Sequence, residues 1–600
     1  MPIVLNVAEK NDAAKNIANI MSRGTSRMRN SYSKYNKIYE FQKNLPSLGQ
    51  SKMIFTSVAG HLLDKDFNEN NRKWFNVDPL DLFEAPIVDF VPDNFKDIKR
   101  TLEKEARTSN VLIIWTDCDR EGENIGFEII KVCSKINPRL KILRAKFSQI
   151  TEQAVNNAIN NLVEPDKRQS DAVEVRRELD LRIGAAFTRF QTMNLQKAVQ
   201  AISQAKSVVS YGSCQFPTLG FIVDRFLEIK KFEPQNFWFI EVIDERMDCK
   251  VSFNWKRHRL FDMNTCTALY VKVLEDPLAK VSSVVSKPTT RYRPNPMDTV
   301  QLEKLASSKL KISSKKTMTI AEKLYQKGII SYPRTETNIF PPDLKLEPLV
   351  SEQTKDNKWG TFAQRVLNDG IHPRQGKKTD KAHPPIHPLK HVTNLENDEY
   401  KVYELIVRHF LACVSSDAIG KQMTVKININ GEEFEANGLN VVHRNFLEVY
   451  IYQKWSDKEL PNYIEGSSFM PQSILQQEGK TTAPALLTEA DLINLMEKNG
   501  IGTDATHAEH IETIQKRFYA EMNKDRRFLP LKLGLGLVNG YTNMGFELSK
   551  PKLRAALERD LQAICDGQKN PKVVLQDQIK KSITSIVNYR QKTRPNDKSP

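Results

Sequence analysis

Three carboxylates follow a short, wholly apolar run in the middle of the first third of the chain. Val111 to Trp115 are five consecutive apolar residues, and Asp117, Asp119 and Glu121 come just after them. Such a run is typical of a strand buried on both faces, and residues two apart on an extended chain point the same way. Asp117 and Asp119 can therefore face one ion, and oxygen ligands suit Mg²⁺. The alternative is an acidic turn that caps a helix starting near Glu123.

A second carboxylate follows another predicted strand. Residues 3–8 are a short apolar strand that ends in Glu9 and Lys10, and residues 53–59 form a further strand that ends in Gly60 and His61. Strands alternating with helices through about residue 160 predict a doubly wound parallel sheet. Ligands of such sheets bind outside the carboxyl ends of the strands, so Glu9 is expected to join Asp117 and Asp119.

Tyr332 lies in a Ser-Tyr-Pro-Arg segment that could act on a phosphate. Pro333 fixes the local backbone, and the guanidinium fork of Arg334 suits a phosphate group. A tyrosine has a pKa of about 10, so attack on phosphorus requires a proton acceptor and a nearby cation. Lys10, Arg334 and the acidic cluster would supply both if the chain folds Tyr332 over the first sheet. Taken alone, Tyr332 could be an ordinary surface residue.

The composition bounds the class of protein. The chain has 600 residues, 40% of them hydrophobic, a net charge of +16 and seven cysteines without a Cys-x-x-Cys pair. We expect several domains, a polyanionic partner rather than merely a basic surface, and neither a disulfide framework nor a zinc ribbon in an intracellular protein. No apolar run reaches the roughly 18 residues of a membrane span. The amino terminus reads as a strand, so neither a signal nor a transit peptide is expected.

Two further segments could contact a nucleic acid. Asp171 to Arg189 read as a helix that brings Arg176, Arg177 and Asp180 to one side. The loop that follows can bring backbone N–H groups close to phosphates; alternatively it is a turn before a helix. Its candidate residues are Ser210, Tyr211, Gly212, Ser213, Cys214 and Gln215.

Alternating aromatic and apolar residues predict antiparallel strands at about 232–286 and again near 422–453. The two β-rich stretches could pair with each other and enclose the segment between them. This insert, about 287–415, begins with two lysine-rich helices and continues into the Tyr332 segment as a strand or loop. That order resembles a winged helix.

These motifs together resemble a known family. Glu9 with the Asp-x-Asp-x-Glu cluster resembles the toprim domain of topoisomerases and primases. The segments at 7–10, 116–123, 210–220 and 330–338 occur in the order seen in type IA DNA topoisomerases, and resemble most closely the alpha type of eukaryotic topoisomerase III. Residues 382–388, 487–491 and 500–507 agree as well, so the resemblance covers nearly the whole chain.

The resemblance implies a reaction and roles for the candidates. Tyr332 would attack a phosphate of single-stranded DNA, forming a 5′-phosphotyrosine and freeing a 3′-hydroxyl, before strand passage and religation without ATP. Glu9 would be the general acid or base, while Lys10 and Arg334 hold the phosphate and His383 supports the phosphate or Tyr332. Mg²⁺ would be held by Asp117, Asp119 and Glu121, with Glu9 as a further candidate ligand. The residues along the DNA strand would be His61, Arg176, Arg177, Asp180, Arg334 and the loop Ser210, Tyr211, Gly212, Ser213, Cys214 and Gln215.

The fold class expected is multidomain α/β plus α and β, with a Rossmann-like toprim domain in a toroidal type IA core. The domains would be toprim at 1–160, a helical DNA-binding domain at 161–230 with 470–600, a β-rich hinge at 231–286 with 416–469, and the tyrosine-bearing insert at 287–415. Relaxation of negative supercoils, decatenation and dissolution of recombination intermediates would follow. The resemblance also implies a nuclear location and two partners. These are a RecQ-family helicase and an OB-fold accessory protein of the RecQ-mediated genome instability type.

Some features depart from the family, and other functions stay open. Many members carry cysteine-rich zinc modules after the core; either this protein lacks them or the chain is cut short. Ser213-Cys214 and Thr503-Asp504 stand where bacterial relatives often have an arginine, which suggests a weaker grip on the backbone. The rival functions are a toprim nuclease or primase, in which water or a nucleotide hydroxyl attacks, and a non-catalytic nucleic-acid-binding scaffold. RNA is an alternative substrate.

Overall fold

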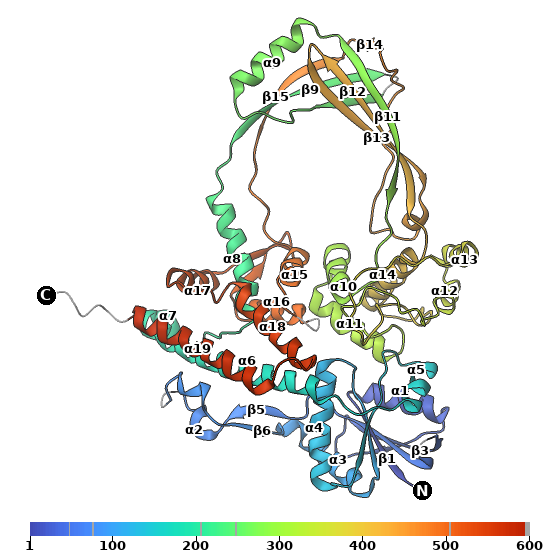
Figure 1. Ribbon diagram of the computed structural model, residues 1–600, viewed down its shortest axis with the longest axis vertical. Helices are drawn as coiled ribbons and strands as arrows, with labels where there is room; N and C mark the ends of the chain where they lie inside the picture. Colours follow the sequence, from blue (N-terminus) through green and yellow to red (C-terminus); the bar gives the residue numbers. More distant parts are fainter. Residues whose placement is uncertain (47, 75–76, 205–206, 247–248, 503–505, 594–600) are drawn as a thin grey trace, which may run out of the picture.

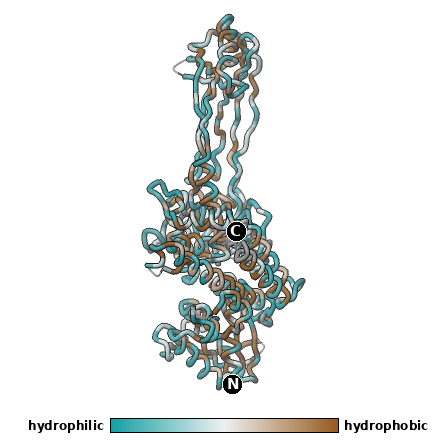
Figure 2. Tube along the Cα trace, turned by 90° about the vertical axis from the view of Figure 1, so that its left-hand side faces the viewer, coloured by the Kyte–Doolittle hydropathy of each residue, from teal (hydrophilic) through white to brown (hydrophobic). Residues whose placement is uncertain are grey.

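The elements of the chain are arranged as a ring. The computed structural model describes residues 1–600 except 47, 75–76, 205–206, 247–248, 503–505 and 594–600. An arch of strands stands on two helical bodies, and a body built on a second sheet lies beneath them (Figure 1). Seen from the side, the arch is a narrow arm that rises from a much wider base (Figure 2). Among the described residues, no helix has the length and apolar character needed to cross a membrane.

The lower body contains a six-stranded sheet in the order β2-β3-β4-β1-β7-β8. Its strands are β1 (Ile3–Ala8), β2 (Arg27–Asn30), β3 (Lys37–Leu45), β4 (Gly49–Ser57), β7 (Val111–Trp115) and β8 (Lys141–Arg144). Strands β4, β1, β7 and β8 are parallel, which confirms the predicted parallel sheet. Strands β2 and β3 add an antiparallel edge that the sequence analysis did not predict. Only three residues separate Leu45 from Gly49, too few for a parallel crossover.

Helices cover both faces of this sheet, which explains the unbroken apolar run in β7. Val4 and Ile113 join one core, with α1 (Asn11–Ser22) and α5 (Glu152–Asn160). Their neighbours Leu5 and Ile114 join another, with α3 (Lys96–Thr108) and α4 (Arg120–Ile136). The remaining elements of this body are small: β5 (Asp64–Phe67), α2 (Glu69–Arg72), η1 (Asp81–Phe83), β6 (Ile87–Phe90) and η2 (Asp93–Phe95).

One helical body is assembled from two distant parts of the chain. Leu179 and Phe216 share a core with Leu492, Ile511 and Leu561. Its elements are α6 (Lys167–Ala198), α7 (Gln200–Gln204), α8 (Gln215–Lys231), α15 (Glu489–Lys498), α16 (His507–Lys516), β16 (Ala520–Met522), β17 (Phe528–Pro530), α17 (Lys532–Asn543), α18 (Pro551–Cys565) and α19 (Pro571–Thr593).

The arch is a seven-stranded sheet in the order β14-β11-β12-β13-β10-β9-β15. Its elements are β9 (Asn236–Arg246), β10 (Cys249–Trp255), α9 (Met263–Glu275), β11 (Ala279–Arg291), β12 (Ala418–Ile429), β13 (Glu432–His443), β14 (Ser468–Phe469) and β15 (Ser473–Lys480). Strand β11 pairs with β12 and β10 with β13, which confirms that the two β-rich stretches pair. Strand β15 pairs with β9, so the sheet continues past 469, where the sequence analysis ended the hinge. Ser473–Lys480 is mostly polar and lacks the alternation that predicted the other strands.

The insert forms the second helical body. Its elements are α10 (Thr299–Leu305), the π-helical turn η3 (Ala306–Leu310), α11 (Ser314–Gln326), α12 (Glu347–Gln353), α13 (Gly360–Asp369) and α14 (Asn397–Cys413), with η4 (Asn445–Glu448) packed beside α14. The two predicted helices are present, and Tyr332 follows them in a loop. Isolated bridges at Ile330–Pro388 and Met297–Ile386 hold this loop in place. Tyr332 thereby belongs to the same apolar core as Trp115 at the end of β7.

Candidate functional site

The carboxyl ends of β1 and β7 bring three acidic side chains together. Ala8 lies beside Trp115 in the register of the two strands, so Glu9 and Asp117 follow at the same sheet edge. The backbone N–H of Asp117 donates to Glu9 Oε2 at 3.3 Å. Burial raises the pKa of Asp117 well above its usual range, and the nearby charges of Glu9 and Asp119 raise it further. The predicted meeting of Glu9, Asp117 and Asp119 is therefore present.

The turn between β7 and α4 is held by two side chains that bond to the backbone around it. Asp119 begins the helix, and its Oδ1 accepts the N–H of Gly122 at 2.7 Å. The guanidinium of Arg144, at the end of β8, is fully buried and donates to the carbonyls of Asp117 (2.8 Å) and Ala145 (2.7 Å). It also pairs with Glu123 at 2.9 Å. Sequence reasoning missed Arg144, although an arginine ending a buried strand needs such partners.

Gly122 has no room for a side chain, which leads to a stability prediction. A Cβ at this position would lie 2.0 Å from the carbonyl oxygen of Asp117. Gly122→Ala is therefore expected to lower the free energy of unfolding by about 1–3 kcal/mol, the usual cost of overpacking. Urea unfolding would measure it. Gly184→Ala is the matched control, since a Cβ there, also within a helix, meets nothing within 4 Å. Equal effects of both substitutions would contradict the prediction.

The structure places the phenol of Tyr332 against the acidic cluster. Its hydroxyl donates to Asp119 Oδ2 at 2.6 Å, and its backbone N–H donates to the carbonyl of Ser148 at 3.1 Å. Tyr332 is only 3% exposed. Burial raises the pKa of Tyr332 well above its usual range, and the carboxylates of Asp119 and Asp117 raise it further. The phenol is therefore held neutral, with a carboxylate already accepting its proton in a hydrogen bond.

Two rings hold the ring of Tyr332 in position. His383 lies 4.5 Å away between ring centres and Tyr325 lies 5.1 Å away. The hydroxyl of Tyr325 donates to Asp117 Oδ1 at 3.1 Å, so two neighbouring tyrosines contact two neighbouring aspartates. Asp380 accepts the backbone N–H of His383 at 2.8 Å and faces its Nδ1 at 3.5 Å. Sequence reasoning missed both Tyr325 and Asp380.

The two predicted phosphate-binding cations share one carboxylate. Lys10 Nζ lies 3.8 Å from Glu322, and Arg334 donates to the same carboxylate at 2.6 and 2.8 Å. Arg334 also reaches Glu509 on α16 at 3.2 Å, while Lys10 lies 3.7 Å from Glu9. The structure thus brings Lys10 and Arg334 together as predicted. Glu322 and Glu509 were missed by the sequence analysis.

Glu121 points away from the other carboxylates. Arg176 pairs with it, and His61 Nε2 lies 3.1 Å from it. Burial would raise the pKa of Glu121, but Arg176 and His61 outweigh burial and lower it to about 2. Glu121 lies inside α4, where each residue turns the side chain by about 100° from the one before. The alternation assumed for an extended chain therefore ends at Asp119.

His61, Arg176 and Arg177 form an ion-pair network beside the acidic cluster. His61 Nδ1 lies 2.9 Å from Glu128, and Arg177 pairs with the same carboxylate at 2.6 Å. Burial would lower the pKa of His61, but its bonds to Glu121 and Glu128 raise it to about 9. These basic side chains, predicted to lie along a DNA strand, are thus brought together but neutralised within the chain.

The predicted phosphate loop is packed against helices. Ser213 donates to Asp180 at 2.7 Å, and Arg554 on α18 donates to both, at 2.9 and 3.1 Å. The ring of Tyr211 stacks on that of Phe187 and packs at a tilt against that of Phe216, and Cys214 is buried. The other loop residues are held too: the Ser210 carbonyl accepts from Tyr519, Gln215 contacts His510, and the Gln215 side chain fills the space beside Gly212. Thr503 and Asp504 lie outside the described residues. Sequence reasoning missed Arg554, which stands beside Ser213.

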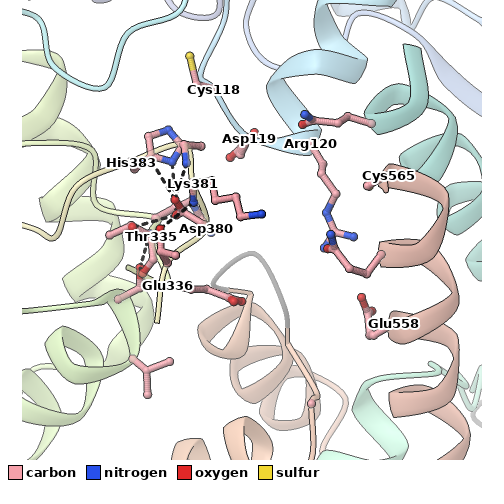
Figure 3. A pocket seen from close by; sticks show the side chains of 18 of the residues that line it. Cys118, Asp119, Arg120, Thr335, Glu336, Asp380, Lys381, His383, Glu558 and Cys565 are labelled. Atoms are coloured by element: carbon pink, nitrogen blue, oxygen red, sulfur yellow. Dashed lines mark hydrogen bonds and ion pairs between the residues drawn. The ribbon is translucent and has the colours of Figure 1, made fainter. Parts of the chain in front are cut away.

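A cavity of about 1320 Å³ opens onto this site. Asp119, His383 and Arg334 line one side, with Tyr332 behind them, and α18 forms the opposite wall. Figure 3 shows Lys381 reaching into the space between the insert and α18. Basic side chains from several elements line the cavity: Arg120, Lys146, Arg334, Lys381, Lys498, Lys552 and Arg559. These seven basic side chains outnumber the five acidic ones on the same lining, which are Asp119, Glu336, Asp380, Glu558 and Asp566. The excess of positive charge suits a polyanion that passes beside the Tyr332 loop.

The acidic cluster has the donor chemistry for a divalent cation. Within the described residues, no three His, Cys, Asp or Glu side chains converge as ready metal ligands. One oxygen each of Asp117 and Asp119 instead accepts a tyrosine hydroxyl. The carboxylates are nevertheless close enough that the charge of Asp119 raises the pKa of Glu9, and the charges of Glu9 and Asp119 raise the pKa of Asp117. A hard cation relieves such repulsion, so these residues fit one better than Glu121 does.

Two family models match most of this chain. A DNA topoisomerase family model matches residues 164–576 and a Toprim domain model matches residues 4–150. DNA topoisomerase 3-alpha of Homo sapiens is 59% identical over 96% of this chain, which spans 58% of that relative's length. DNA topoisomerase 3 of Schizosaccharomyces pombe is 42% identical over 95% of this chain and 94% of the relative.

A solved structure shares the fold. Full-length topoisomerase I from Thermotoga maritima superimposes with a TM-score of 0.74 at 23% identity, covering 97% of this chain and 90% of that one. The Toprim match covers the sheet that carries Glu9, Asp117 and Asp119, and the family match covers the insert that carries Tyr332. The chain therefore belongs to the type IA DNA topoisomerase family, on its eukaryotic topoisomerase III branch of the alpha type.

Proposed function

We propose that this chain cuts single-stranded DNA by transferring one phosphodiester to Tyr332, lets another strand pass, and then rejoins the cut strand. The observation that carries the proposal is the position of Tyr332, whose hydroxyl lies 2.6 Å from Asp119 at the carboxyl edge of the toprim sheet. A nucleophile, a proton acceptor and two phosphate-binding cations are then within one site. The bond energy is kept in the phosphotyrosine ester, so ATP is not required.

The proposed step balances within the site. The Tyr332 oxygen forms a bond to phosphorus, and the bond from phosphorus to the 3′-oxygen breaks. Asp119, which already accepts the hydroxyl hydrogen, takes the phenol proton. Glu9 gives a proton to the leaving 3′-oxygen, and burial, which raises the pKa of Glu9, favours the protonated form that this step needs. Religation reverses each transfer.

Lys10 and Arg334 would hold the phosphate. Both cations contact Glu322 in the structure, at 3.8 Å from Lys10 and 2.6 Å from Arg334. A phosphate arriving between them would offer oxygens of the same charge, so it would compete with Glu322 for the two side chains. Glu322 thereby keeps the cations in place while no DNA is bound. His383, stacked on Tyr332, would keep the phenol oriented.

A Mg²⁺ ion would be held by Asp117 and Asp119 with Glu9 beside them, and would supply positive charge for the acidic cluster and the phosphate. The proposed set of Mg²⁺ ligands leaves out Glu121, which pairs with Arg176 and His61. These two and Arg177 would act on DNA only if the strand displaced their acidic partners. The basic cavity beside α18 offers the more direct route for a strand.

The wider roles are proposed from the family. The insert would lift from the toprim sheet as a gate, with the arch as its hinge, on the µs–ms scale of domain motions. Lifting would break the contacts of Tyr325 with Asp117, of Gln326 with Asn16 and of Lys10 with Glu322. Relaxation, decatenation and dissolution of recombination intermediates in the nucleus, together with a RecQ-family helicase and an OB-fold accessory protein, complete the proposal.

The test is the covalent intermediate itself. The protein is incubated with end-labelled single-stranded DNA, with Mg²⁺ or with EDTA, and the reaction is stopped with detergent. We expect DNA attached through its 5′ phosphate to the peptide that contains Tyr332, only when Mg²⁺ is present. A nuclease would release both DNA ends free of protein, and a binding scaffold would leave the strand intact; either result would refute the proposal. An RNA strand of the same sequence tests the alternative substrate.

A further inference from the structure

A loop at the edge of the toprim sheet combines exposed tyrosines with basic side chains. Residues 31–36 join β2 to β3, and within them Tyr32 is 47% exposed and Tyr35 is 73% exposed. Arg100 and Lys104 lie 4.6 Å and 5.6 Å from the ring centre of Tyr32, and Lys34 lies 4.9 Å from that of Tyr35. We call these five residues the tyrosine platform. Accessible rings beside cations are typical of surfaces that bind single-stranded nucleic acids.

The loop is held in one shape before any ligand binds. The Asn36 side chain donates to the carbonyls of Ser57 and Val58, each at 3.0 Å. The hydroxyl of Ser31 donates to the carbonyl of Asn36, and the backbone N–H of Tyr32 donates to Thr101 at 3.3 Å. Because these bonds already order the backbone, a ligand that binds the two rings would cause little further loss of conformational entropy in the loop.

The platform lies at the same end of the sheet as the proposed cleavage site. Strands β4 and β1 are parallel, so Ser57 and Ala8 end side by side. Asn36 contacts the end of β4, and the backbone N–H of Lys37 donates to the Asn11 side chain at 2.9 Å. Asn11 is one residue from Lys10 and two from Glu9. A strand leaving Lys10 along this edge would therefore meet the platform.

The charges of the platform are available to a ligand. In the part of the chain that the structure describes, neither Lys34 nor Lys104 forms an ion pair, and Arg100 lies 3.6 Å from the exposed Asp97. The neighbouring Arg29, by contrast, is neutralised by Glu40 and Glu105. The platform thus offers two unneutralised ammonium groups, Lys34 on the loop and Lys104 on α3, next to its rings. Phosphates and stacked bases require this arrangement together.

We propose that the tyrosine platform binds a single-stranded segment of DNA outside the cleavage site, with a base stacked on Tyr35 and phosphates beside Lys34 and Lys104. This proposal rests on the proposed function in one respect: the strand on the platform is the continuation of the DNA strand that Lys10 and Arg334 hold. Stacking contacts the π-face, which every base has, so this contact would hold the strand without selecting its sequence.

The first test measures affinity without cleavage. All proteins carry Tyr332→Phe, and binding of a labelled poly(dT) strand is measured by fluorescence anisotropy. The strand has about 30 nucleotides, more than the roughly 4–16 that one OB fold covers. Tyr35→Ala is expected to bind about fivefold more weakly, the lower end of the effect of one stacked base. Tyr35→Phe, which keeps the ring, is expected to stay within about twofold of the parent.

A matched control separates the platform from exposed aromatic residues in general. Tyr292, in the insert, is 63% exposed and also has a cation, Arg374, 5.3 Å from its ring. Tyr292→Ala is expected to leave affinity unchanged. If Tyr35→Ala binds the strand as tightly as its parent, or if Tyr292→Ala weakens binding equally, the platform is not a DNA site and its proposed role falls.

The second test locates the strand directly. The same poly(dT) with 5-iododeoxyuridine at single positions is photo-crosslinked to the Tyr332→Phe protein, and the crosslinked peptide is identified by mass spectrometry. One labelled nucleotide should crosslink near the Tyr332 loop. We expect the nucleotides that crosslink to residues 31–36 to lie all on the same side of it along the strand. Crosslinks confined to the Tyr332 loop and the α18 cavity would overturn the proposal. Because neither test requires cleavage, a failure of the platform is distinguishable from a failure of the cleavage mechanism.

Discussion

A Tyr332→Phe variant is expected to form no covalent adduct with single-stranded DNA, with cleavage reduced on the order of 10⁶-fold, the scale found when an enzyme loses its nucleophile. The substitution removes one oxygen, the one that lies 2.6 Å from Asp119. The ring keeps its contacts with His383 and Tyr325, so the Tyr332 loop should remain folded. Adduct formation is measured with end-labelled DNA, Mg²⁺ and a detergent stop.

Tyr325→Phe is the matched control for this prediction. Tyr325 is buried like Tyr332, and its hydroxyl also donates to an aspartate of the cluster, Asp117, at 3.1 Å. Losing that hydrogen bond costs about 1 kcal/mol, so this variant should still form the adduct, although more slowly. An adduct that persists in Tyr332→Phe, or that vanishes only in Tyr325→Phe, would show that a different residue attacks the phosphate.

The sequence was sufficient to find the parts of the site that lie on regular strands. The apolar run before Asp117 fixed a buried parallel strand, and parallel strands place their carboxyl ends at one edge, so the meeting of Glu9 with Asp117 and Asp119 followed from local pattern alone. The role of Tyr332 came from the family resemblance. No local pattern brings it to Asp119 across 213 residues of sequence.

Residues whose partners are distant in sequence escaped prediction. Glu322 and Tyr325 are three residues apart on α11 and share the face that meets the toprim sheet. The sequence did show a carboxylate and a tyrosine at this spacing. An amphipathic helix carries many such pairs, however, so the spacing alone did not mark Glu322 and Tyr325 as site residues. Arg144 and Arg554 are buried arginines. Their structural role depends on the carbonyls and carboxylates that surround them, and only the tertiary fold brings these groups together.

The assignment of Glu121 shows where a pattern stops being valid. Residues two apart point the same way only while the chain stays extended, and α4 begins at Arg120, directly after Asp119. Glu121 therefore turns toward Arg176 and His61, which lower its pKa to about 2. Strand β15 was misplaced for a related reason, since a strand at the edge of a sheet can be mostly polar and leave no alternation to read.

A Glu9→Gln variant is expected to cleave DNA about 10²–10⁴-fold more slowly, the usual contribution of a general acid. The Glu9 side chain is 14% exposed and lies between Lys10, at 3.7 Å, and the backbone N–H of Asp117, at 3.3 Å. Glutamine keeps the shape and can still accept that N–H, but it has no acidic proton for the leaving 3′-oxygen. Single-turnover cleavage of a labelled strand at saturating protein gives the rate of this step.

A substrate with sulfur in place of the bridging 3′-oxygen separates proton donation from positioning. A thiol has a pKa of about 8.5, so a thiolate leaves without a proton, whereas an alkoxide does not. Glu9→Gln should therefore cleave the sulfur substrate at close to the parent rate, while Tyr332→Phe cleaves neither substrate. If the sulfur substrate gives Glu9→Gln no recovery, the carboxylate acts instead by holding Lys10 or a cation in place. The leaving group's proton would then have to come from another group, because the two carboxylates that cluster with Glu9, Asp117 and Asp119, already accept hydroxyls from Tyr325 and Tyr332.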